Sequence, residues 1–155
     1  MPNILTKARP EESRFYYHII KIGFTGTSTS RNFLPMPGAE TQREGTSMTN
    51  LSDQFVFQCP YDGSIEKAIL RGETATDSTV IGFYTGTTQE IPSLLGGYDG
   101  DITVDCDTAN TCFEFDFTSE SNTFSKHMIL AFAYQPTTGP GDCQIMIVLK
   151  FDVTT

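Results

Sequence analysis

Short segments in which apolar and polar residues alternate one by one are the feature that most restricts the fold of this chain. The run 54–59, Gln-Phe-Val-Phe-Gln-Cys, alternates cleanly, and Phe113, Phe115 and Phe117 repeat at the same spacing. Successive side chains of a β-strand point to opposite faces, so a period of two predicts strands with one buried face. We therefore expect these phenylalanines to lie in a core between sheets.

Further strands are expected where β-branched and aromatic residues gather between turn residues. The predicted strands are 15–24, a short edge strand at 32–36 that contains a proline, 54–59, 64–71, 79–85, a hairpin of 101–105 with 112–117, 127–134 and 143–153. Residues 37–53 and 91–100 are predicted to be irregular loops. This pattern predicts an all-β fold, an antiparallel, jelly-roll-like β-sandwich of eight or nine strands. Residues 1–14 are predicted to be an N-terminal arm and residues 15–155 a single β-sandwich domain.

The strand at 127–134 is apolar on both faces. One face carries Met128, Leu130, Phe132 and Tyr134, and the other carries Ile129, Ala131 and Ala133. A strand of this kind needs cover on both sides. The cover is predicted to come either from the N-terminal strand or from a neighbouring subunit, and a homo-oligomer is expected, with a trimer favoured.

Charge and hydropathy exclude several partners. The chain has 155 residues, 10 Lys plus Arg against 19 Asp plus Glu, and a net charge of −9, which disfavours contact with nucleic acid phosphates. No apolar run is long enough to cross a membrane, and residues 1–7 lack the order of a signal peptide. We expect a soluble protein that is assembled in a cytoplasm.

The four cysteines admit more than one state. Cys106 and Cys112 flank the loop of the predicted hairpin, but pairing the apolar faces of its strands places Cys106 opposite Thr111. A bulge would be needed to form a Cys106–Cys112 disulfide. Cys59 and Cys143 continue apolar faces and are predicted to be core residues with free thiols.

No pattern of catalytic or metal-binding residues stands out, and neither an enzymatic activity nor a cofactor is expected. The two histidines, His18 and His127, lie inside predicted strands without a second ligand at a suitable spacing. The acidic segment 97–101, with Asp105 and Asp107 beyond it, lacks the ligand spacing of an EF-hand, so a solvated turn is the preferred interpretation over a Ca²⁺ site. Glu114 and Asp116 fit outward positions of a strand, so we interpret them as solvent-facing rather than as an acid and base.

The predicted contact residues are few. Three tyrosines at turns or strand ends are the best candidates for contact with a sugar or a protein. The full set is Tyr61, Tyr84 and Tyr98, Arg9 and Arg14 in or beside the arm, and Met128 and Phe132 on the strand that is apolar on both faces.

Several short segments together resemble a domain of virion structural proteins of tailed bacteriophages, especially marine ones. They are 17–21 (Tyr-His-Ile-Ile-Lys), 33–35 (Phe-Leu-Pro), 55–63 with its Pro-Tyr-Asp-Gly turn, 67–71, 78–82 and 113–115 (Phe-Glu-Phe). The similarity runs from about Phe15 to Phe151. The chain departs from the pattern in its cysteines and at 125–127, Ser-Lys-His.

The resemblance implies a β-sandwich module at the virion surface. A capsid decoration or cement protein, or a short head spike or head fibre, is expected, with the major capsid protein or other virion proteins as partners. In this interpretation the arm and the loop 37–53 lie on the capsid. The alternative is a receptor-binding module of a tail fibre or spike, whose loops 85–92 and 94–101 bind a host surface glycan.

Overall fold

The computed structural model describes residues 14–26, 28–37, 56–86, 93–94, 101–119, 122–138 and 141–154, with the backbone alone at 93–94. These residues form strands joined by turns, and no helix within these ranges is long and apolar enough to cross a membrane. The strands are β1 (Phe15–Thr25), β2 (Asn32–Phe33), β3 (Phe57–Gln58), β4 (Gly63–Gly72), β5 (Asp77–Gly86), β6 (Ser93–Leu94), β7 (Asp101–Cys106), β8 (Cys112–Asp116), β9 (Thr123–Phe124), β10 (Ile129–Pro136) and β11 (Asp142–Asp152).

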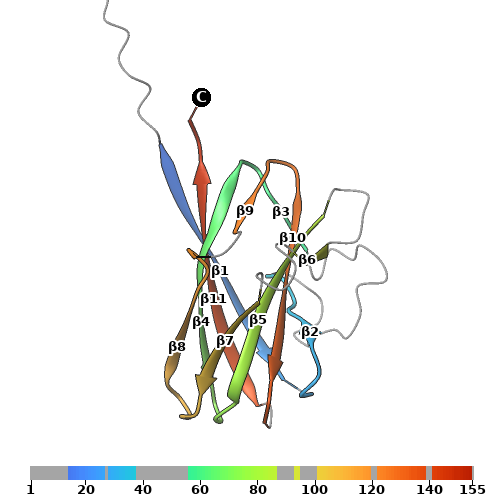
Figure 1. The fold of residues 1–155 in the computed structure, drawn as a ribbon, viewed down its shortest axis with the longest axis vertical. Coiled ribbons are helices and arrows are strands. Elements are labelled where there is room, and N and C mark those ends of the chain that lie inside the picture. The colour runs from blue at the N-terminus through green and yellow to red at the C-terminus, as the bar shows by residue number, and fades with distance from the viewer. Residues whose placement is uncertain are drawn as a thin grey trace, which may run out of the picture.

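The strands form two antiparallel sheets, as Figure 1 shows. The first sheet has the order β1-β11-β4-β8, and β9 also pairs with β4. The second has the order β2-β10-β5, beyond which β5 pairs with both β6 and β7, while β3 pairs with β10. Eight of the strands thus fall into two sets of four, β1-β11-β4-β8 and β2-β10-β5-β7, with the chain passing between the sheets as in a jelly roll. The predicted jelly-roll-like β-sandwich is confirmed. The described residues form eleven strands where eight or nine were predicted, and the additional ones are the two-residue strands β6 and β9.

The core lies between the two sheets. Phe24 of β1 packs edge-on against Tyr134 of β10 at 5.1 Å between ring centroids, and Phe83 of β5 packs in the same manner on Phe117 at 5.2 Å. Both contacts join one sheet to the other. The inward residues of β11 are completely buried, which is the burial that its alternating sequence predicts.

The predicted hairpin of 101–105 and 112–117 is wrong. β7 pairs with β5, from Asp77↔Cys106 to Gly82↔Asp101, whereas β8 pairs with β4, from Lys67↔Asp116 to Arg71↔Cys112. The connection between them therefore passes from one sheet to the other and does not form a hairpin turn. Cys106 is buried, Cys112 is exposed, and all four cysteines are free thiols.

The N-terminal strand, one of the two predicted sources of cover, packs on one face of β10, since Phe24 of β1 contacts Tyr134. β1 belongs to the first sheet, yet Ile129, Ala131 and Ala133 on the outer face of β10 are buried within a single chain. Gly82 of β5, which pairs with Ala133, is covered by the side chains of Asp101 and Arg31, which lie within 3.4 Å of the position of an added Cβ. The outer face of β10 therefore does not require an oligomer to be covered.

Other predictions on individual segments had mixed outcomes. β2 is a short strand at the edge of the described sheet, as predicted, and it pairs there with β10; Cys59 and Cys143 are core residues. The predicted irregular loop 91–100 contains β6, which pairs with β5. His127 lies in a turn with a φ of 70° before β10 and not inside a strand. Residues 1–13 of the predicted arm, residues 38–53 of the predicted loop and residues 54–55 of the predicted strand 54–59 lie outside the described residues.

Candidate interaction surface

Exposed aromatic side chains gather where β1 begins. Phe15, Tyr16 and Tyr61 are 51%, 56% and 45% exposed, respectively. They come together because Phe15 pairs with Asp152 at the end of β11, and the backbone N–H of Asp152 donates to the carbonyl of Asp62 at 2.8 Å. We call this region the aromatic end and define it by Phe15, Tyr16, Tyr61, Phe124 and Met128.

A hollow of about 520 Å³ opens at the aromatic end. It is lined by Phe15, Asp62, Gly63, Ser64, Thr123, Phe124, Ser125, Met128, Lys150 and Asp152. The ammonium of Lys150 lies 4.1 Å from the centroid of the Phe15 ring, a cation–π contact. Apolar surface from Phe124 and Met128 lies beside charged groups from Asp62, Lys150 and Asp152. This combination suits the binding of an amphipathic partner segment.

The aromatic residues at this end are held by ring contacts. Tyr61 and Phe124 both pack edge-on against the buried Phe151, at 6.2 Å and 5.8 Å between centroids. His18 stacks on Phe57 at 5.5 Å and lies 6.2 Å from Phe151. Side chains that are exposed yet fixed lose little conformational entropy when a partner binds, so the aromatic end is preorganised for contact.

Three of the predicted contact residues converge here. Tyr61 and Met128 belong to the aromatic end, and Arg14 directly precedes β1, where its carbonyl accepts a hydrogen bond from the N–H of Val153 at 2.9 Å. Phe15 and Tyr16 were not predicted as contacts. Their signal in the sequence is the unbroken aromatic run 15–17, which an ordinary half-buried strand does not need.

The other predicted contact residues lie elsewhere. Phe132 has no exposed surface and belongs to the core, so it presents nothing to a partner; its face of β10 points between the sheets. Tyr84 is half-buried on β5, where its hydroxyl accepts a hydrogen bond from Arg31 at 2.6 Å and its ring packs edge-on against Phe33 at 5.2 Å. Arg9 and Tyr98 lie outside the described residues.

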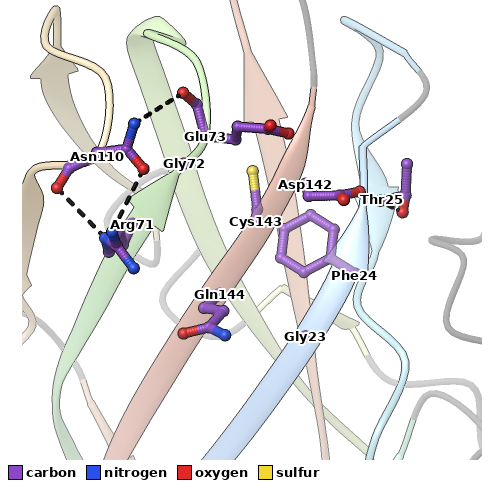
Figure 2. A pocket seen from close by; sticks show the side chains of 10 residues that line it. All are labelled: Gly23, Phe24, Thr25, Arg71, Gly72, Glu73, Asn110, Asp142, Cys143 and Gln144. Carbon is purple, nitrogen blue, oxygen red and sulfur yellow. Dashed lines mark hydrogen bonds between the residues drawn. The ribbon is translucent and has the colours of Figure 1, made fainter.

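A second hollow of about 340 Å³ lies near the other end of β1 and is drawn in Figure 2. Nε of Arg71 donates to the carbonyl of Asn110 and Nη2 donates to its side-chain oxygen, both at 3.3 Å, while the Asn110 amide donates to the carbonyl of Glu73 at 3.4 Å (Figure 2). Asn110 has a φ of 59°, typical of a turn. These bonds fasten the β7–β8 connection to β4, which is a structural role.

The two carboxylates of β8 face solvent, as predicted. Glu114 pairs with Lys67 at 2.8 Å, and Asp116 accepts hydrogen bonds from the hydroxyl and N–H of Thr118. The bond from the Thr118 hydroxyl is the main cause that lowers the pKa of Asp116 below its usual range. A general acid in glycoside cleavage needs a raised pKa, so Asp116 is not suited to that one role.

Metal-binding groups do not cluster in the described part of the chain, which contains no set of three or more His, Cys, Asp and Glu side chains arranged around a common point. Asp101, the last residue of the acidic segment considered for Ca²⁺, forms an ion pair with Arg31. Residues 97–100 of that segment lie outside the described ranges.

The fold defines the class of the protein as a jelly-roll β-sandwich. No family model and no curated protein matches the chain. Among solved structures, a subunit of the disulfide-linked pili of Bacillus endospore appendages is similar with a TM-score of 0.40 and 13% identity over 91% of this chain and 90% of that one. A chain of infectious bursal disease virus, Gx strain, has a TM-score of 0.43 and 8% identity over 99% of this chain and 37% of that one. For Desmodium yellow mottle tymovirus the TM-score is 0.37 and the identity 8%, over 98% and 94%. Similarities this distant do not assign a function.

Proposed function

We propose that the chain is a structural protein of a bacteriophage virion, a capsid decoration or cement protein or a short head spike, that docks on the major capsid protein through its aromatic end. The resemblance of its sequence segments to phage virion proteins supports this role. The jelly roll also suits it, since this architecture recurs in viral capsid and lectin domains. The expected location is the capsid surface, after assembly in the host cytoplasm.

The observation that carries the proposal is the group of exposed aromatic residues beside Arg14. Tyrosine, phenylalanine and arginine are enriched in protein interfaces, and tyrosine and arginine also at their energetically important centres. Phe15, Tyr16 and Tyr61 remain about half exposed in the single chain, and the hollow between β1 and Met128 can accept an apolar side chain of a partner. Residues 1–13 lead into this same end, so an arm that lies on the capsid would extend the contact surface.

The proposed role is mechanical and not enzymatic. Burial of the aromatic end against the capsid would remove apolar surface from water. The free energy gained is roughly 25 cal/mol for each Å² of that surface, which favours the assembled particle. The acidic chain, with a net charge of −9, is suited to contact with protein rather than with packaged DNA.

Reconstitution on particles that lack the protein tests this function. Purified full-length chain is mixed with phage particles from which its gene has been deleted, and the bound fraction is measured by sedimentation. We expect saturable binding and a higher temperature of DNA release. The double variant Tyr16→Ser/Tyr61→Ser should bind at least tenfold more weakly.

Ile69→Ser is the control, because Ile69 is a partly exposed apolar residue of β4 that pairs with Met146 of β11 and lies outside the aromatic end. It should retain binding to particles. Binding of the chain to host cells or to arrayed glycans, without binding to particles, would overturn the capsid role and favour a receptor-binding module.

A further inference from the structure

β1 is an edge strand whose outer edge is open among the described residues. It pairs with β11 over all of its 11 residues, from Phe15↔Asp152 to Thr25↔Asp142, without a register shift. Within the described sheet order, no strand lies on its other side. Long, regular, unprotected edges of this kind are ready templates for pairing with another chain.

The direction of the backbone groups follows from two hydrogen bonds. The carbonyl of Arg14 accepts from Val153, and the N–H of Gly26 donates to Gly141, so even-numbered residues point their backbone groups toward β11. Odd-numbered residues of β1, from Phe15 to Thr25, therefore direct their N–H and C=O groups to the open edge. The same residues carry the outward side chains, among which Phe15, Tyr17 and Ile19 are 51%, 56% and 58% exposed.

Charged residues or short strand length protect the other edges of the described sheets from pairing with another chain. β8 carries Glu114 and Asp116, β7 carries Asp101 and Asp105, and β2, β3, β6 and β9 have two residues each. β1 contains no proline and no bulge, and Lys21 is its one Lys, Arg, Asp or Glu residue. Proline, charge and short length are the usual protections. The outer edge of β1 is therefore suited to recruit a strand.

We propose that a second copy of this chain pairs with β1 in an antiparallel, twofold arrangement in which Ile19 lies opposite Ile19 of the partner subunit. This register places Tyr17 opposite Lys21 of the partner subunit, a position suited to a cation–π contact. Phe15 lies opposite Gly23 of the partner subunit. A Cβ added at Gly23 would meet nothing within 4 Å, so this glycine leaves open space for an aromatic ring.

Neighbouring registers are less favourable. Only odd-numbered residues direct their backbone groups to the open edge, so each must pair with an odd-numbered residue of the partner subunit. The next possible register in either direction therefore shifts every pairing partner by two positions. One step brings Ile19 opposite Lys21 of the partner subunit and sets an apolar residue against a charge. A shift in the opposite direction pairs Phe15 with Lys21 of the partner subunit and shortens the paired segment to residues 15–21. The register centred on Ile19 keeps 15–23 paired and matches each side chain with a compatible one.

The area of this interface indicates a reversible dimer. Fully buried aromatic side chains contribute about 150 to 250 Å², so each half-exposed side chain on the outer face offers on the order of 100 Å². Phe15, Tyr17 and Ile19 together supply less than half of the roughly 800 Å² per partner that is typical of stable complexes. The ladder hydrogen bonds add to this, and two five-stranded sheets become one continuous sheet. The proposed oligomer is a twofold dimer, whereas the sequence analysis favours a trimer.

Sedimentation equilibrium of the full chain over a range of concentrations tests the inference. We expect a monomer–dimer equilibrium that Ile19→Lys shifts to monomer, with at least a tenfold weaker association, because it sets two like charges opposite each other at the centre of the ladder. Ile69→Lys is the matched control, since Ile69 lies on the outer face of the same sheet but on β4, between Met146 and Glu114. It should leave the association constant within twofold.

Amide hydrogen exchange distinguishes this surface from any other. In the dimer the amides of Tyr17, Ile19 and Lys21 should be protected, and dilution or Ile19→Lys should expose them, while the amides of Ile20 and Ile22 stay protected throughout. A monomer at all concentrations, a trimer, or a dimer whose odd-numbered β1 amides exchange freely would overturn the inference. The inference does not depend on the capsid role. Phe15 belongs to both surfaces, but the test variants do not, since Ile19 lies outside the aromatic end and Tyr16 and Tyr61 lie off the outer face of β1, so either experiment can fail without the other.

Discussion

Arg31 and Asp101 form a two-pronged ion pair that ties the segment before β2 to the first residue of β7. Nη1 of Arg31 donates to Oδ1 of Asp101 at 3.1 Å, and Nη2 donates to Oδ2. The same Nη1 reaches the hydroxyl of Tyr84 at 2.6 Å. The hydrogen bond to Asp101 is the main cause that raises the pKa of Arg31 above its usual value. The pair lies against Gly82, where a Cβ would stand 2.2 Å from Oδ1 of Asp101.

Removal of either partner of this pair should destabilise the protein. The side chains are 28% and 24% exposed, so Arg31→Met and Asp101→Asn are each expected to cost about 1 to 2 kcal/mol, between the values for exposed and fully buried pairs. Urea unfolding of both single variants and of the double variant measures the coupling. The exposed pair Lys67–Glu114 is the control, and Lys67→Met should cost less. Additive effects of the two Arg31–Asp101 substitutions would show that the contact contributes nothing.

Asn32 is a polar residue in an apolar site. Its side chain is completely buried, and neither its amide nitrogen nor its oxygen has a hydrogen-bond partner among the residues that the structure describes. Asn32→Leu keeps a similar volume and removes the unpaired groups, so it should raise the free energy of unfolding by about 1 to 3 kcal/mol. Thr79→Val is the contrasting variant and should lower stability, because the buried Thr79 hydroxyl bonds Thr76 at 2.8 Å. A loss of stability in Asn32→Leu would contradict this prediction.

Gly63 begins β4 where backbones approach closely. A Cβ there would lie 2.4 Å from the carbonyl oxygen of Lys150, close to the register shift at Val148/Leu149 in the β11–β4 ladder. Because backbone atoms cannot move aside cheaply, Gly63→Ala should cost about 1 to 3 kcal/mol. Gly23→Ala has open space around the new methyl group and should be neutral or slightly stabilising. Thermal unfolding of both variants compares the two positions, and equal melting temperatures would refute the crowding at Gly63.

Cys59 should make stability depend on alkaline pH. Burial raises the pKa of its thiol to about 12, whereas an unfolded cysteine titrates near 8.5. Between these values the unfolded chain releases a proton that the folded chain retains, so the stabilisation is complete below about pH 8.5 and falls as pH rises, by about 1.4 kcal/mol per pH unit from this group. Denaturant unfolding from pH 8 to pH 10.5 measures the slope. Cys59→Ala should reduce the dependence of stability on pH. Ile65→Val, a buried substitution without a titrating group, should lower stability but leave its dependence on pH unchanged.

Period-two patterns were sufficient to predict most of the architecture. The bounds of β4, β5 and β11 agree with prediction to within about two residues, because alternating burial leaves a direct trace in the sequence. The pairing of β7 and β8 could not be predicted in the same way. Turn residues at 107–111 indicate that the chain reverses direction. They do not indicate that β7 pairs with β5 of the second sheet and β8 with β4 of the first.

The candidate interaction surface was predicted only in part. Tyr61, Arg14 and Met128 were identified from their types and local positions, but they are 47 to 114 residues apart along the chain, and only the folded sheets bring them to one end. Phe132 was misjudged because a strand that is apolar on both faces does not reveal which face the core will take. The Arg31–Asp101 pair depends on the placement of β2 beside β10, which no local pattern specifies.

The ladder between β1 and β11 has a consequence for biosynthesis. Thr25 and Asp142, which are joined by a hydrogen bond of 2.7 Å, are separated by 117 positions in sequence. On the ribosome, β1 emerges early and must wait for β11 to be translated before this ladder can close. The first sheet therefore cannot close before β11 has been synthesised, and we expect it to fold slowly, as in other proteins dominated by long-range pairings. During that interval both edges of an aromatic strand are open, and nascent chains on one polysome are candidates for premature association.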